Sequence, residues 1–169
     1  MSSNQAQTIQ HNRQTPTQFV IFTLIAAVVA TLAAWSSAAL RLEPWVMFTG
    51  FIAWFTRPTS SREGVNSVIC LWLGIGLAAA AHTATAALAS SIGGLALPVI
   101  VFLVAIVVVG LRTTKIVDNM LSWFLGLVAF FAAGLEPSLE AFVHLGSASA
   151  IGGFAGWTCQ ALNRRWAGA

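Results

Sequence analysis

Apolar residues along the chain gather into segments that are separated by short polar breaks. An α-helix rises 1.5 Å per residue, so about 20 residues cross the roughly 30 Å hydrocarbon core of a bilayer. The pattern predicts an all-α membrane protein with six transmembrane helices, at about 19–40, 44–56, 65–90, 95–112, 119–134 and 139–162. The second and fifth segments reach only about 20 to 24 Å, so they must tilt, lie in thinned membrane or form half-helices.

Local signals support these boundaries. Glu43-Pro44 opens the second segment, and Ser60 with Glu63 forms a capping box before the third. Asp118-Asn119 and Pro137-Ser138 precede the fifth and sixth segments, and the turn at 91–94 separates two halves.

The N-terminal stretch 1–17 is polar, contains no acid and lacks apolar periodicity. We expect a disordered cytoplasmic tail over 1–17, followed by one transmembrane domain over 18–164. The apolar run that follows the tail is longer than the apolar core of a secretory signal peptide. A retained first span is therefore favoured over a signal peptide.

An octapeptide occurs twice. FTGFIAWF at Phe48 to Phe55 recurs as FLGLVAFF at Phe124 to Phe131, with the same Phe, Gly, Ala and final Phe. Chance is the alternative in a chain with 11 Phe and 7 Trp. The recurrence and the matched segment lengths predict two related halves, over 18–91 and 94–164.

Charged residues indicate how the halves are oriented. With both termini in the cytoplasm, only Arg41 among the basic residues lies outside, in agreement with the positive-inside rule. The halves then run in opposite directions and form an inverted 3+3 repeat, a design that often marks a transport pathway. The cytoplasmic basic residues would be Arg13, Arg57, Arg62, Arg112, Lys115, Arg164 and Arg165, and the outer acids Glu43, Glu136 and Glu140.

Composition excludes several classes of protein. With 57% hydrophobic and 8% charged residues, and a mean hydropathy of +0.82, polar side chains are too few to cover a water-soluble globule. The eight Lys and Arg are scattered, which argues against nucleic-acid binding. No enzyme, cofactor or metal motif is present, and Cys70 and Cys159 are expected to be small packing residues.

Aromatic side chains form the leading candidate for a solute path. Helical spacing places Phe48, Phe51 and Phe55 on one face. Two such faces that met across the pseudo-axis would form a slot that passes flat, uncharged solutes and refuses ions. Packing against lipid or other helices is the alternative. The expected pore lining also includes Phe124, Leu127 and Phe131, with Gly50 and Gly126 where a helix or a solute approaches the backbone.

His82 and His144 are the ionisable residues deepest in the predicted spans. An intramembrane histidine is a candidate for a polar or pH-sensing role, such as proton relay or gating. The alternative is a neutral histidine that bonds to a neighbouring carbonyl or hydroxyl. Small-residue stripes in the third and sixth segments, such as Gly152 and Gly156, are expected to join the halves or two protomers.

The run W45-x-x-F48-x-G50-x-x-A53-x-F55 resembles the first short segment of the small bacterial inner-membrane family that includes YcdZ, a domain of unknown function. The stretch from Ser122 to Ala132 resembles that family's second short segment. Here the chain lacks the proline that the family has before Gly126, a difference that bears on whether the fifth segment is broken. More remotely, the six-span plan is similar to urea, amide and acetate channels, which are homo-oligomers.

These observations together predict a homo-oligomeric channel or facilitator in the bacterial inner membrane. Its partners would be the lipid bilayer and a small uncharged or weakly ionised solute, such as urea, an amide, ammonia or a short carboxylic acid. Two alternatives remain, a membrane scaffold that transports nothing and a proton-coupled carrier that uses His82 and His144.

Overall fold

The computed structural model describes residues 16–114 and 116–166, and this part of the chain is helical, without strands. The helices begin and end within a few residues of the predicted segments. Pro16 and Thr17, assigned to the tail, begin the first helix, and the rest of the predicted tail lies outside the described residues. The helices are α1 (Pro16–Ala39), α2 (Pro44–Phe55), α3 (Ser61–Ile92), α4 (Ala96–Gly110), α5 (Met120–Ala133) and α6 (Leu139–Trp166), with short 3-10 turns η1 (Gly93–Leu95) and η2 (Leu111–Thr113).

Side-chain caps and glycines account for these boundaries. The Ser60 hydroxyl accepts a hydrogen bond from the Glu63 amide at the start of α3, as the capping box predicts. The Ser138 hydroxyl does the same for the Ala141 amide near the start of α6. Gly134, in the left-handed conformation with φ +62°, ends α5. Between Met120 and Ala133, α5 is continuous, so the fifth segment is an unbroken helix.

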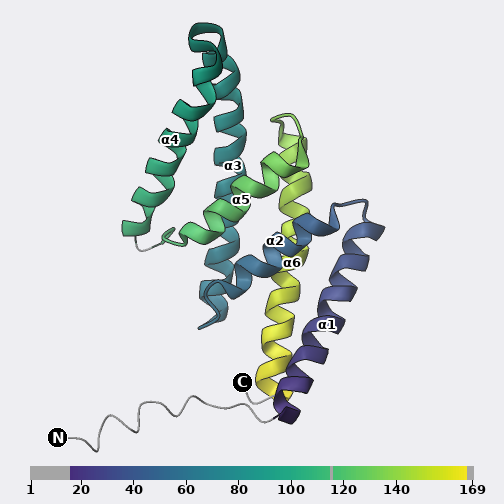
Figure 1. Cartoon of the computed structure of the whole chain (residues 1–169). Helices are drawn as coiled ribbons and strands as arrows, with labels where there is room; N and C mark the ends of the chain where they lie inside the picture. The colour runs from purple at the N-terminus through teal and green to yellow at the C-terminus, as the bar shows by residue number, and fades with distance from the viewer. Residues whose placement is uncertain (1–15, 115, 167–169) are drawn as a thin grey trace, which may run out of the picture.

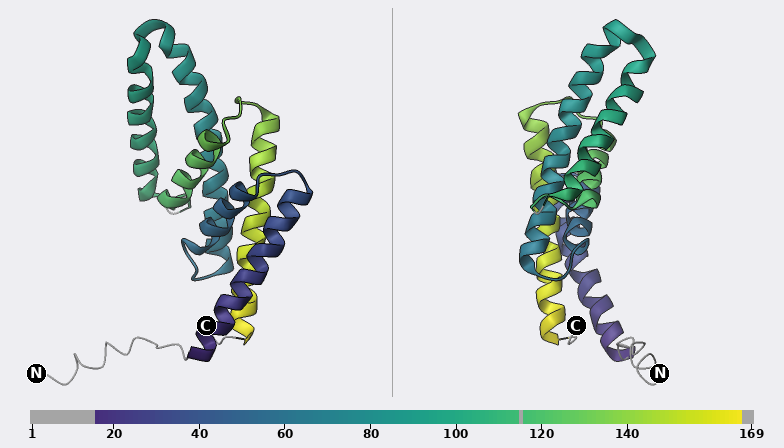
Figure 2. Two further views of the ribbon diagram at one scale, coloured as in Figure 1. Left: turned by 45° about the vertical axis from the view of Figure 1, so that its right-hand side comes forward. Right: turned by 90° about the vertical axis from the view of Figure 1, so that its left-hand side faces the viewer.

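Two long helices organise the molecule, and the two short helices cross them. The helix α2 packs across α6, and α5 packs across α3 (Figure 1). The peripheral helices follow the same rule, because α1 lies beside α6 and α4 lies beside α3 (Figure 2). Followed along the chain, α1, α2 and α3 run opposite to α4, α5 and α6 respectively (Figure 1).

Glycines bring the crossing helices into backbone contact. A methyl group at Gly50 would collide with the Ser149 carbonyl oxygen, and one at Gly152 would collide with that of Met47. The other crossing is built in the same way, with Gly126 against the Leu71 carbonyl and Gly74 against that of Trp123. Gly50 and Gly126 occupy the same place in the two octapeptides, and nearly the same offset along the chain relates Gly74 to Gly152. The two crossings therefore use corresponding positions of the sequence.

Fewer helices than predicted are apolar and long enough to cross a membrane by themselves. In the described part of the chain, two stretches meet both criteria, Pro16–Ala39 and Ser61–Thr113. The second stretch includes the reversal at Gly93, so it contains both α3 and α4. The apolar helices α2 and α5 are too short, and α6 is diluted by small and polar residues such as Ser149, Gln160 and Asn163. The two long apolar stretches indicate association with a membrane, but they support fewer than the six predicted transmembrane helices, of which the second and fifth were expected to be too short.

Candidate functional site

A cluster of polar side chains joins the two halves where three helix ends meet. We call it the polar latch. It connects the last turn of α2 to the first turns of α3 and α5. Its members are Thr56, Arg57, Glu63, Ser67, Asp118, Asn119 and Ser122.

Asn119 is the centre of the latch. Its amide nitrogen donates to the Thr56 hydroxyl at 2.6 Å and to the Ser67 hydroxyl at 2.7 Å. Its amide oxygen accepts the backbone N–H of Ser122 at 3.3 Å and so caps α5. Asn119, Ser67 and Ser122 are buried, so these bonds replace contacts with water that the groups have lost. The side chain that caps α5 therefore also fixes the ends of α2 and α3.

An ion pair covers the latch. The Arg57 guanidinium lies 2.7 Å from the Asp118 carboxylate and 3.5 Å from that of Glu63. The hydrogen bond from Arg57 lowers the pKa of Asp118 below its ordinary value. The same bond raises the pKa of Arg57, and burial opposes that change. The loops before α3 and before α5 are therefore held together.

Sequence reasoning found parts of the latch but not the whole. Asp118-Asn119 and Ser60 with Glu63 were recognised as helix-start signals, whereas Thr56, Ser67 and Ser122 were not singled out. A signal was present, because the offset that relates the two octapeptides pairs Ser122 with Val46 and Thr56 with Ala132. Each of these polar residues has an apolar counterpart in the other copy of the repeat. The difference indicates a polar cluster that the repeat does not duplicate.

The two aromatic triplets do not line a common cavity in the described part of the chain. Phe51 packs beside a small cluster of Ala33, Met47 and Ala155, and its ring lies 5.1 Å from that of Phe55. The second triplet, Phe124, Leu127 and Phe131, lines a cavity of about 220 Å³ against α3 and α4. The predicted slot between the two faces is therefore not formed by a single chain.

Gly50 and Gly126 are buried at the helix crossings described above. The prediction left open whether a helix or a solute would approach them, and the structure places a helix there. Their assignment to a pore lining is corrected on this ground, because backbone carbonyls fill the space that a solute would need.

The two histidines lie in different surroundings. The His82 ring is half-buried and meets the ring of Phe130 edge-on, with the ring centres 6.2 Å apart. His144 is also half-buried and lines a hollow of about 400 Å³ with Glu136, Ser138 and Glu140.

The histidines are also not repeat equivalents. The offset that relates Gly74 to Gly152 leads from His82 to Gln160 and not to His144. The Gln160 side chain accepts a hydrogen bond from the Trp54 indole N–H at 3.1 Å, and Trp54 corresponds to Phe130 in the octapeptides. The pair of His82 and Phe130 at the crossing of α3 and α5 thus corresponds to the pair of Gln160 and Trp54 at the crossing of α6 and α2.

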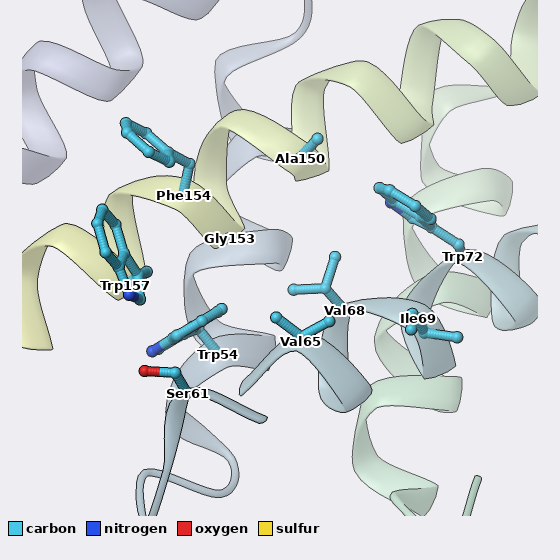
Figure 3. Close-up of a pocket in the computed structure, with 10 residues that line it drawn as sticks. All are labelled: Trp54, Ser61, Val65, Val68, Ile69, Trp72, Ala150, Gly153, Phe154 and Trp157. Atoms are coloured by element: carbon cyan, nitrogen blue, oxygen red, sulfur yellow. The ribbon is translucent and has the colours of Figure 1, made fainter. Parts of the chain in front are cut away.

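A larger groove runs between α3 and α6. Its volume is about 570 Å³, and its lining is almost entirely apolar (Figure 3). The side chains of Trp54, Trp72 and Trp157 are part of its lining. The Trp72 indole N–H donates to the Ser149 hydroxyl at 3.0 Å, so this polar group, like that of Trp54, is satisfied by the protein.

The hydroxyls and thiols inside the spans show ordinary packing roles. Thr83 and Thr85 donate to the carbonyls of Ala79 and Ala81 one turn earlier, as such residues commonly do in helices. Cys70 and Cys159 are buried and unpaired thiols. Within residues 16–114 and 116–166, no group of three or more His, Cys, Asp and Glu is arranged to hold a metal ion.

A family model described as a protein of unknown function, DUF1097, matches residues 23–164. The match runs from within α1 to near the end of α6 and includes both crossings and the latch. No curated protein and no solved structure matches the chain, so the remote similarity to urea, amide and acetate channels finds no support there.

Proposed function

Because the chain belongs to the DUF1097 family of proteins of unknown function, whose description gives no activity, we propose a function from the geometry. The protein is a channel or facilitator of the bacterial inner membrane for a small uncharged or weakly ionised solute. Urea, amides, ammonia and short carboxylic acids are the candidates. It works as a homo-oligomer and is not an enzyme.

In this proposal all six helices cross the bilayer as an inverted 3+3 repeat. The opposite directions of the paired helices and the two matched glycine crossings support it (Figure 1). The latch supports a common face for the loops that carry Arg57 and Asp118, and positive charge assigns that face to the cytoplasm. Both termini then lie in the cytoplasm. The short helices α2 and α5 cross where the bilayer is locally thinned, which is how a bilayer accommodates a short hydrophobic helix.

The cavity beside α4 is the observation that supports passage of a solute. It gathers the second aromatic triplet, Phe124, Leu127 and Phe131, with Thr85 on α3 and apolar residues of α4. The Thr85 proton is already donated to Ala81, so its oxygen faces a solute as an acceptor only. Such a lining offers nothing that replaces the hydration of an ion, and it therefore selects uncharged molecules. His82, on the turn before Thr85, is the neighbouring polar residue.

A flux assay tests this proposal. Purified protein in liposomes should accelerate the entry of at least one of urea, acetamide, ammonia and acetate, measured by stopped flow against empty liposomes. Leu127→Trp should fill the cavity and reduce that flux about tenfold or more, because Leu127 is 7% exposed and faces the cavity. Phe102→Trp, at an α4 position that is 65% exposed, should leave the flux unchanged and is the matched control.

Equal fluxes with and without protein for all four solutes would contradict the channel. The second candidate is then a membrane scaffold, which is favoured by the closed glycine crossings and by the internal bonding of the latch. A proton-coupled carrier predicts instead that an imposed pH gradient drives uptake and that His82→Ala or His144→Ala abolishes the drive. Cysteines placed along residues 121–131 should react on one helical face if the path exists.

A further inference from the structure

The groove between α3 and α6 has a lining that suits a hydrocarbon chain. Val65 and Ile69 on α3 and Trp157 on α6 are each at least 42% exposed, which leaves large apolar surfaces without a partner in this chain. Gly153 and Ala150 make the hollow, because neither residue extends a large side chain into it (Figure 3). Its volume of about 570 Å³ is within the range of roughly 300–1,000 Å³ that is usual for sites of small molecules.

The hydrogen bonds of the groove also point to an apolar occupant. The indole N–H groups of Trp54 and Trp72 are bonded to Gln160 and Ser149, so the rings contribute apolar surface and no free donor. Ser61 is the hydroxyl-bearing residue of the lining, and it lies at the first residue of α3. The groove is therefore apolar along its length and polar at one end.

Two arginines lie near that polar end in the sequence and the fold, although neither lines the groove itself. Arg62 follows Ser61 directly and is exposed. The Arg164 guanidinium donates to the carbonyl of Thr59 at 3.3 Å, which places it beside the loop that leads to Ser61. The nearby acid Glu63 is 3.5 Å from Arg57, so its charge is partly compensated. A cationic mouth on an apolar groove is complementary to one kind of molecule, a lipid with an anionic headgroup.

We propose that this groove binds one anionic phospholipid of the cytoplasmic leaflet. An acyl chain lies between α3 and α6 against Trp54, Trp72 and Trp157, and the phosphate lies at Arg62 and Arg164. The site is separate from the cavity beside α4, and it is occupied whether or not the protein passes a solute.

Lipids with brominated acyl chains test the site, because bromine quenches tryptophan fluorescence on contact. The full chain is placed in phosphatidylcholine vesicles that contain a small, equal fraction of brominated phosphatidylglycerol or brominated phosphatidylcholine. We expect stronger, saturable quenching by the anionic lipid. The preference should fall about fivefold for each arginine replaced in Arg62→Gln and Arg164→Gln, the change expected for one basic residue near a membrane surface. Arg112→Gln, at the end of α4, is the matched control and should keep it.

A variant that fills the groove separates the lipid from other occupants. Ala150→Phe, at a half-buried position of the lining, should abolish the preference while circular dichroism shows an unchanged helix content. Equal quenching by the two brominated lipids in the unmodified protein would overturn the proposal. A change in subunit number caused by Ala150→Phe, without any lipid preference in the unmodified protein, would also overturn it and would assign the groove to a second copy of the chain. Neither result depends on solute flux.

Discussion

Single atoms decide how closely the helices of this protein approach. At Gly50 and Gly126 the place of the missing side chain is occupied by a carbonyl of the crossing helix, at corresponding positions of the two octapeptides. A backbone cannot withdraw as a flexible side chain can, so any added carbon forces the helices apart. The fold therefore requires glycine at these two positions, independently of the protein's function.

Gly50→Ala and Gly126→Ala should each destabilise the protein by about 1 to 3 kcal/mol, the usual cost of overpacking a closely packed core. Unfolding in detergent, followed by circular dichroism, measures the change. Gly146→Ala on α6 is the matched control, because no atom of another helix lies within 4 Å of the place its methyl would take. A loss at Gly146 as large as at Gly50 would contradict this account.

At the residue scale the sequence singled out the right glycines but could not assign their contacts. The recurrence marked Gly50 and Gly126 as special, and the choice between a helix and a solute depended on tertiary packing. Ser149 and Leu71, whose carbonyls fill the two spaces, carry no local pattern that names them as partners. The same limit applies to Asn119, which is visible in sequence as a cap and in the structure as a three-way connector.

Between elements, the latch fixes the end of α2 to the starts of α3 and α5. Helix boundaries were predictable because they depend on local signals, such as the caps at Ser60 and Asn119. The crossing of α2 over α6 was not, because the two partners are distant in sequence and their periodicity is that of any buried helix. The latch contains the Arg57–Asp118 ion pair, so its contribution to stability depends on pH.

Stability should fall in acid because of Asp118. The hydrogen bond from Arg57 lowers the pKa of Asp118 in the folded protein. Its stabilising contribution is therefore complete above the unfolded-state pKa of about 3.9 and is lost as the pH falls through the lower folded-state value. The pair is partly exposed, at 35% and 25%, so we expect less than about 1 kcal/mol.

Asp118→Asn should lower the free energy of unfolding at pH 6 and reduce its further decrease towards pH 3. Thermal unfolding across this range measures both effects. Glu140→Gln is the control, because Glu140 lies at the start of α6, outside the latch, and should not change the shape of the curve. Identical pH curves for Asp118→Asn and the unmodified protein would show that the ion pair contributes nothing.

For the molecule as a whole, the latch restricts the possible membrane topologies. Arg57 follows α2 and Asp118 precedes α5, and their side chains are 2.7 Å apart. Both loops must then lie on the same face of the bilayer, so α3 and α4, which lie between them in the sequence, either both cross or both turn back. For α2 and α5, the bias of positive charge favours the proposed crossing, since turning back would move Arg57 and Arg62 to the outer side.

Labelling of single cysteines distinguishes the two topologies. With a membrane-impermeant thiol reagent, Ser91→Cys and Glu136→Cys should react in cells whose outer membrane is permeabilised. Thr59→Cys and Arg165→Cys should react only after the inner membrane is broken. The native Cys70 and Cys159 are buried and should stay unreactive, which the unmodified protein checks. If α2 and α5 turned back, residue 59 would react from outside and residue 91 only from inside, because α3 crosses the bilayer in either case. Such a labelling pattern would mean four crossings and not six. The two halves would then no longer have opposite orientations, and the inverted repeat would be contradicted.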